Sequence, residues 1–142
     1  MKRLAPSSAN QPSVVSNSCK KNLVLLADDE EPILRVVKEL LTHKGYGVIT
    51  ASDGAQALEQ FAQNIDDIKV IIMDMNMPVM DGLLCIKKLK QMKSLVKIIA
   101  VSGMDGNQER LSREQIDIYD FVLKPYCVDK LADKIKSAME AA

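Results

Sequence analysis

Short apolar runs alternate with segments of helical periodicity along most of this chain, and this alternation limits the fold more than any other feature. Asn22–Ala27 and Val70–Met73 are almost purely apolar, which is typical of buried parallel strands. Between them, apolar residues at helical spacing begin near Pro32 and stop at Gly45, as expected for the two ends of a helix. The pattern predicts a layered α/β domain.

Strand and helix patterns continue to alternate after this first part of the chain. The further predicted strands are Tyr46–Ala51, Lys97–Val101 and Tyr119–Leu123, and the further helices are Ala55–Asn64, Leu83–Met92, a weaker Asn107–Gln115 and Val128–Met139. Right-handed crossovers between parallel strands leave few topologies at this size. We therefore predict a flavodoxin-like (βα)5 three-layer sandwich with sheet order 2-1-3-4-5, in which ligands bind beyond the carboxyl ends of the strands.

Composition and charge limit the domain organisation and the partners. Residues 1–20 are rich in Ser, Pro, Asn and Gln, so we expect a disordered tail or linker there and one domain over residues 21–142. The 19 basic and 19 acidic residues give zero net charge, which argues against direct binding to nucleic acid or to a membrane surface. No apolar run could span a bilayer and no signal peptide is recognisable, so a cytoplasmic location is expected.

Polar residues stand where the predicted strands end. Asp28 and Asp29 follow the first strand, Asp74 the third, Ser102 the fourth and Lys124 the fifth. Carboxyl ends of parallel strands share one edge of the sheet, so these side chains are expected to meet. Close carboxylates repel by on the order of 4 kcal/mol per pair at an intermediate dielectric. Such a cluster calls for a hard cation, and Mg²⁺ fits oxygen ligands best.

Four segments resemble the receiver domain of two-component response regulators, and the match runs from about Lys21 to the end of the sequence. LVLLADDEEPI resembles the family's first strand and acidic pair, and VIIMDMNMPVMDG its phosphoacceptor strand and following loop. IIAVSG resembles the strand with the switch hydroxyl, and FVLKPY the strand with the lysine. Each segment alone is weakly specific, but four in the family's order are strongly specific.

The resemblance implies a role for each matching residue. Asp74 matches the phosphoacceptor, Asp29 the direct metal ligand and Asp28 the acid that acts partly through water. The backbone carbonyl of Asn76 matches the third protein ligand of Mg²⁺. The residues matching the phosphoryl-binding and switch positions are Ser102, Lys124 and Phe121, with a cis bond expected between Lys124 and Pro125.

Two positions depart from the family pattern. Asp117 stands where the family often has Gly, which leaves the turn before the fifth strand and the length of the preceding helix open. Met104 is apolar where some members have an acid or an amide. We expect Asn76 and Met104, each two residues past a site residue, to modulate the rate of dephosphorylation.

The implied function is that of a signalling phosphoacceptor rather than an enzyme. A histidine kinase or histidine phosphotransfer domain would donate the phosphoryl group to Asp74, with Mg²⁺ as cofactor, and so switch a surface for an unknown downstream protein. A weak homodimer through the last two strands is a further option. A free-standing regulator and the receiver of a hybrid kinase are two expectations that the sequence leaves open.

Two other classes of function compete with this interpretation. Phosphatases of the haloacid dehalogenase type also form an aspartyl phosphate, but they need an acid two residues after the nucleophile, and Asn76 stands there. The second class is a receiver fold that binds partners without phosphorylation. Such domains typically lack an acid or the lysine, whereas Asp28, Asp29, Asp74 and Lys124 are all present here.

Overall fold

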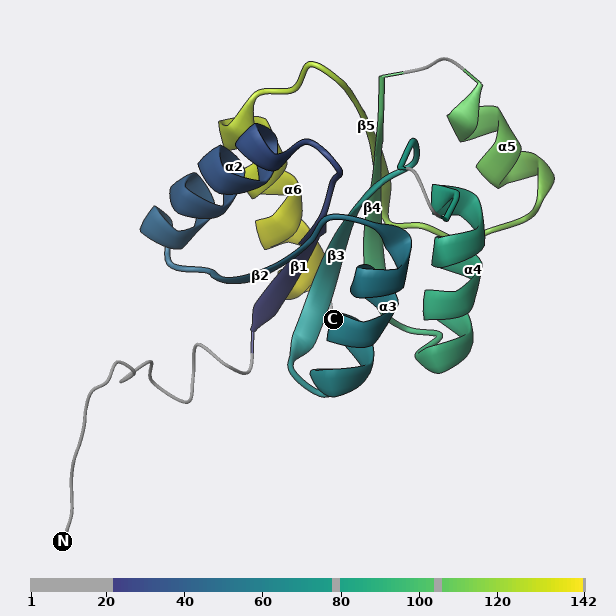
Figure 1. Ribbon diagram of the computed structural model, residues 1–142, viewed down its shortest axis with the longest axis horizontal. Coiled ribbons are helices and arrows are strands. Elements are labelled where there is room, and N and C mark those ends of the chain that lie inside the picture. Colours follow the sequence, from purple (N-terminus) through teal and green to yellow (C-terminus); the bar gives the residue numbers. More distant parts are fainter. Residues whose placement is uncertain (1–21, 78–79, 104–105, 142) are drawn as a thin grey trace, which may run out of the picture.

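The computed structural model describes residues 22–77, 80–103 and 106–141. Five parallel strands form one sheet in the order β2-β1-β3-β4-β5, as predicted (Figure 1). The strands are β1 (Leu23–Ala27), β2 (Gly47–Ala51), β3 (Ile68–Asp74), β4 (Lys97–Ser102) and β5 (Asp120–Leu123). The helices are α2 (Glu31–His43), α3 (Gly54–Gln63), α4 (Gly82–Met92), α5 (Asn107–Arg113) and α6 (Val128–Glu140).

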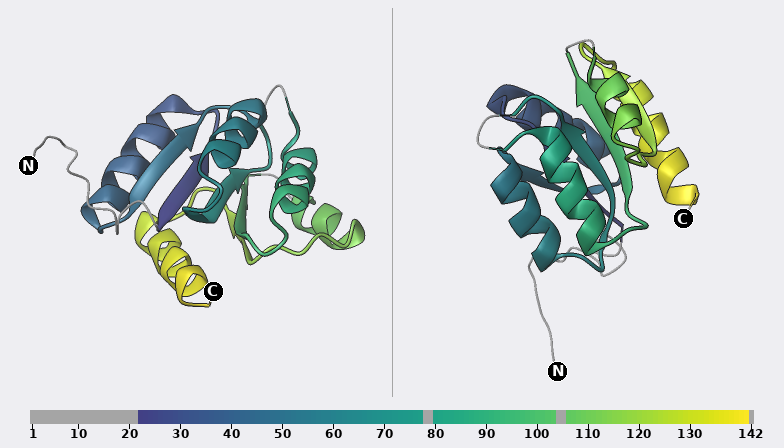
Figure 2. Two further views of the ribbon diagram at one scale, coloured as in Figure 1. Left: turned by 90° about the horizontal axis from the view of Figure 1, so that it is seen from below. Right: turned by 90° about the vertical axis from the view of Figure 1, so that its right-hand side faces the viewer.

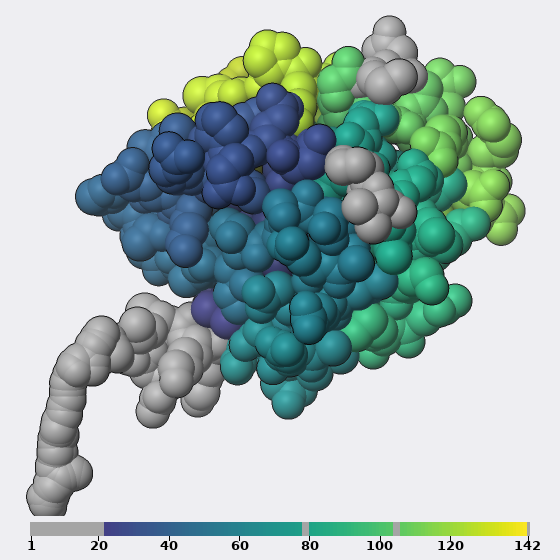
Figure 3. Space-filling view, viewed as in Figure 1, coloured from purple at the N-terminus to yellow at the C-terminus, as the bar shows by residue number. Residues whose placement is uncertain are grey.

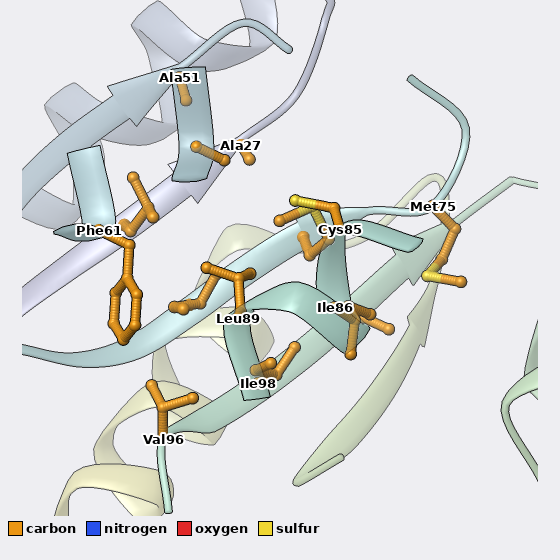
Figure 4. Packing of buried hydrophobic residues seen from close by; sticks show 14 of the residues in the cluster. Ala27, Ala51, Phe61, Met75, Cys85, Ile86, Leu89, Val96 and Ile98 are labelled. Atoms are coloured by element: carbon orange, nitrogen blue, oxygen red, sulfur yellow. The ribbon is translucent and has the colours of Figure 1, made fainter. Parts of the chain in front are cut away.

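Helices cover both faces of the sheet, which gives the predicted three layers (Figure 2). Side chains alternate along each strand, so Leu25 and Ile71 pack toward α3 and α4, whereas Val24 and Val70 pack toward α2 and α6. The first of these two cores is built around Phe61 and further apolar residues of α4, β4 and the segment after β3 (Figure 4). In the space-filling view, the segments with the colours of α2, α3 and α4 follow one another from left to right across the visible face (Figure 3).

The predicted elements agree with the structure to within about two residues, apart from details at their ends. Strand β3 begins at Ile68, two residues before the predicted start at Val70. The prediction started too late because the polar Lys69 interrupts the apolar run in the sequence. Helix α5 ends at Arg113, and Gln115 takes the left-handed conformation with φ 57°. Gln115 rather than Asp117 therefore makes the tight turn before β5.

The carboxyl ends of β1, β3, β4 and β5 all lie at one edge of the sheet, the upper edge in Figure 1. Helix α4 starts very close to this edge. An ideal Cβ on Gly82 would lie 2.5 Å from the Cα of Met75 and 2.9 Å from the carbonyl oxygen of Asp74. Only glycine allows the helix to begin against the end of β3, so Gly82 helps to define the position of Asp74.

Some sequence-based expectations concern residues outside the described part of the chain. The tail or linker expected over residues 1–20 lies there, as does Met104. Among the described residues, no helix is long and apolar enough to span a membrane.

Candidate functional site

Carboxylates from two neighbouring strands meet at the upper edge of the sheet. Asp28 and Asp29 directly follow β1, and Asp74 is the last residue of β3. One carboxylate oxygen of each residue lies within 4.8 Å of those of the other two. Asp28 and Asp74 are buried, whereas Asp29 is exposed. The predicted convergence is therefore present, and this set of hard oxygen atoms fits Mg²⁺ better than a softer metal.

An open cavity of about 310 Å³ lies beside these carboxylates. Its lining includes Asp29, Glu30, Asp74, Asn76, Gly103 and Lys124. The backbone N–H of Asn76 donates a hydrogen bond of 3.0 Å to Oδ1 of Asp74 and so orients this carboxylate. The cavity has room for a cation and a small anion next to Asp74.

Lys124 reaches into the acidic cluster from the end of β5. Its Nζ lies 3.0 Å from Oδ2 of Asp28 and 3.2 Å from Oδ2 of Asp74, and it also contacts Glu30 at 3.2 Å. Partial burial alone would lower the pKa of Lys124, but the hydrogen bond to Asp28 and the charges of Asp74 and Asp28 outweigh it and raise this pKa. The predicted cis bond between Lys124 and Pro125 is present.

The ammonium of Lys124 thus offsets part of the repulsion among the carboxylates, and a bound cation would offset the rest. Glu30 was not among the predicted site residues. The run Asp28-Asp29-Glu30 carries the only sequence signal for it, since a third acid directly follows the acidic pair. Its carboxylate is exposed and competes with the other acids for Lys124.

Asp74 is held in an environment that penalises its charge. Burial raises the pKa of its carboxyl group, and the charge of Asp28 adds to this effect. The N–H of Asn76 and the ammonium of Lys124 lower the pKa but do not fully compensate. In the metal-free protein, the ionised form of Asp74 therefore destabilises the fold.

Substituting Asp74 with Asn should consequently stabilise the metal-free protein at pH 7, by on the order of 1 kcal/mol or about 3 °C. A raised folded pKa means that the cost of ionisation is fully present above that pKa. The gain should shrink as the pH falls through the folded pKa and vanish below the ordinary value of 3.8. Thermal unfolding of both proteins in chelator between pH 7 and pH 4 measures it, and a pH-independent difference would contradict the burial argument.

Ser102 and Phe121 take different positions relative to the acidic cluster. Ser102 is fully buried at the end of β4, and its hydroxyl donates to Oδ1 of Asn76 at 2.9 Å. Asn107 Nδ2 donates to the same Ser102 oxygen at 2.7 Å. Phe121 lies within β5, three residues before Lys124, and packs partly buried against the core under α3 and α4. It also lines a separate surface groove next to α5. Among the described residues, Ser102 is therefore linked to Asp74 through Asn76.

Comparisons with known proteins identify the family. The model of the response regulator receiver domain matches residues 24–136. This chain therefore belongs to the response-regulator receiver domain family, and the predicted fold is the fold of that family.

Relatives of two kinds share this domain. The chemotaxis protein CheY of Bacillus subtilis is 30% identical over 117 residues, covering 82% of this chain and 96% of the relative. The transcriptional regulatory protein PrrA of Mycobacterium tuberculosis is also 30% identical, over 116 residues that cover 82% of this chain but only 49% of PrrA. The chain thus spans about half the length of such transcriptional regulators.

Solved structures agree with this assignment. A response regulator receiver domain protein of Clostridium thermocellum aligns with a TM-score of 0.79 and 28% identity, over 84% of this chain and 95% of that one. The response regulator TrrA of Thermotoga maritima, solved in complex with Mg²⁺ and BeF, aligns with a TM-score of 0.73 and 29% identity, over 82% and 98% of the two chains.

Proposed function

We propose that Asp74 accepts a phosphoryl group from a phosphohistidine and that this modification switches a partner-binding surface. One observation carries the proposal: Asp74 is a buried carboxylate at the end of β3, with carboxylate oxygens of Asp28 and Asp29 within 4.8 Å and Lys124 Nζ at 3.2 Å. Lys124, together with a cation held by the carboxylates, would offset the additional negative charge that the phosphoryl group brings.

The oxygens of Asp28, Asp29 and Asp74, with the backbone carbonyl of Asn76, are the proposed ligands of Mg²⁺. When bound there, Mg²⁺ would neutralise negative charge on the phosphoryl oxygens. A structural relative that binds Mg²⁺ and BeF supports this choice of cation. Asp29 is the exposed member of the set, and so it can take up a cation from solvent without rearrangement of the core.

In the proposed transfer, an oxygen of Asp74 attacks the phosphorus as the P–N bond of the donor histidine breaks. The electron pair of that bond returns to the imidazole nitrogen, and a new P–O bond joins the phosphoryl group to Asp74. Oδ1 is already oriented by the N–H of Asn76. Lys124 needs only to move from Oδ2 of Asp74 to an oxygen of the incoming group, because its Nζ already lies at the cavity. Ser102 then donates a hydrogen bond from its hydroxyl to another phosphoryl oxygen, and Phe121 follows that movement.

An apolar groove supports a protein donor rather than a small molecule alone. It measures about 610 Å³ and runs from the first turns of α2 to the segment after β5, with Pro32, Ile33, Val36, Pro125 and Tyr126 in its lining. Lys124 lies in the same lining, so the groove borders the acidic cluster. A histidine kinase or histidine phosphotransfer domain is the proposed occupant. We assign the downstream partner and a weak homodimer to the surface of the last two strands, β4 and β5, where Leu123 is exposed.

Two further parts of the proposal concern the lifetime of the modification and the location of the protein. Asn76 lies between Asp74 and Ser102 in the hydrogen-bond pattern, where its side chain can influence the approach of a hydrolytic water. Met104 is kept as the second modulator. We also propose a cytoplasmic location, as expected from the sequence.

A labelling experiment separates this function from that of a phosphatase. With Mg²⁺ and a small acyl phosphate, we expect one phosphoryl group per chain, labile to base and to hydroxylamine, that decays over minutes or longer. Asn76 offers no acid for the leaving group, and its Oδ1 already accepts hydrogen bonds from Ser102 and Asn107. Mass spectrometry counts the label, and many turnovers on an aryl phosphate would favour the phosphatase instead.

A further inference from the structure

A connected set of polar side chains links the site to α5, and the proposed transfer does not involve its members on this helix. Asn107 is the first residue of α5 and only 5% exposed. Its Nδ2 donates to Ser102 Oγ at 2.7 Å and to Asn76 Oδ1 at 3.2 Å. Its Oδ1 accepts from Arg110 Nη1 at 3.0 Å, and Arg110 Nη2 pairs with Asp81 at 2.9 Å. A buried amide with several hydrogen-bond partners restricts the orientations of the side chains that it contacts.

Arg110 determines the direction of every hydrogen bond in this set. A guanidinium group only donates, so the atom of Asn107 that faces it must be the carbonyl Oδ1. The Nδ2 group of Asn107 therefore faces Ser102 and Asn76. The atom of Asn76 that faces Nδ2 of Asn107 must be a hydrogen-bond acceptor, so it is Oδ1. The same Oδ1 also accepts the hydrogen bond from the Ser102 hydroxyl. The hydroxyl proton of Ser102 is thereby directed toward Asn76.

We propose that Asn107, oriented by Arg110, is a positioning residue that holds the Ser102 hydroxyl in its unphosphorylated orientation. The inference rests on the proposed function, in which Ser102 donates to a phosphoryl oxygen on Asp74. A hydroxyl has a single proton, so this donation requires the bond to Asn76 to break. Turning the side chain also moves Oγ away from Asn107 Nδ2. Asn107 therefore stabilises the resting arrangement over the phosphorylated one.

This arrangement couples the site to the surface of α5. Asn107 and Arg110 both belong to α5, so a shift of this helix changes the hydrogen bonds that hold Ser102. Coupling between two binding events is reciprocal. A protein that displaces α5 and a phosphoryl group on Asp74 should thus favour the same orientation of Ser102.

Binding of beryllium fluoride with Mg²⁺, as a phosphoryl mimic, tests the inference without any turnover. Asn107→Ala removes a contact that only the resting arrangement has, so it should tighten the mimic about fivefold, the equivalent of one neutral hydrogen bond. Arg110→Ala frees the Asn107 amide to rotate and should shift the affinity in the same direction, by about twofold. Dissociation constants from calorimetry measure both effects. A loss of stability common to both arrangements would leave these constants unchanged.

Three further variants show whether Asn107 acts through Ser102. In a Ser102→Ala background, the effect of Asn107→Ala should disappear, as the coupling in a double-mutant cycle requires. Asp81→Asn breaks the ion pair but keeps the bond between Arg110 and Asn107, and Arg113→Ala removes a charge elsewhere on α5, so both should bind like wild type. Unchanged or weaker binding by Asn107→Ala, or an equal effect without Ser102, would overturn the inference. Wild-type protein that binds no mimic would instead overturn the proposed function.

Discussion

Replacing Asp74 with Asn should abolish phosphoryl labelling by acyl phosphates, lowering the labelled fraction by more than about 100-fold. The amide is a poor nucleophile, and it also removes one of the three carboxylates that converge within 4.8 Å. The fold should persist, because the substitution preserves shape and relieves an unfavourable buried charge. A loss of labelling would therefore report on chemistry rather than on unfolding.

Asp66→Asn provides the matched control for this prediction. Asp66 is exposed and lies just before β3, at the end of the sheet opposite the site. The same chemical change there should leave labelling at the wild-type level. Mass spectrometry of the intact proteins, followed by peptide mapping after hydroxylamine treatment, locates the label. Labelling of Asp74→Asn at the wild-type level would mean that another residue is the phosphoacceptor.

The fold could be predicted in detail because each element carries its own local signal. Apolar runs such as Ile98–Val101 are expected in strands that are buried on both faces of a sheet, and all four residues of this run are buried. Which helix residues face the core was harder to predict. Leu40 fits the apolar pattern of α2 by spacing, yet it is 41% exposed, because the apolar stripe of this helix is wider than its contact with the sheet.

The acidic cluster could be predicted from strand order, but its hydrogen bonds could not. Strand ends on one edge bring Asp28, Asp74 and Lys124 together whatever the detailed packing. Asn107 carries no comparable signal, because an Asn at the start of a weak helix is usually read as a cap. Its burial and its contact with Ser102 depend on how the start of α5 lies next to the end of β4, which is a property of tertiary packing.

Removing the charge of Lys124 should have the largest effect on stability among the site substitutions. The side chain of Lys124 is 17% exposed, and those of its partners Asp28 and Asp74 are 3% and 4% exposed. Without the ammonium, these buried carboxylates lose their compensating charge. Lys124→Met should therefore destabilise the metal-free protein by about 3 kcal/mol. Urea unfolding in chelator measures the loss, and Lys134→Met, which breaks a more exposed pair with Asp120, should cost less than about 1 kcal/mol.

Magnesium should reverse much of this loss, because a divalent cation can supply the missing positive charge. Lys124 Nζ lies within 3.2 Å of two proposed metal ligands, so it repels a cation bound there. We expect Lys124→Met to bind Mg²⁺ about tenfold more tightly than wild type and to gain more stability from added Mg²⁺. Labelling by acyl phosphate should nevertheless fall, since the phosphoryl oxygens lose their ammonium partner. Weaker Mg²⁺ binding, measured by calorimetry, would show that Lys124 and the metal do not share these carboxylates.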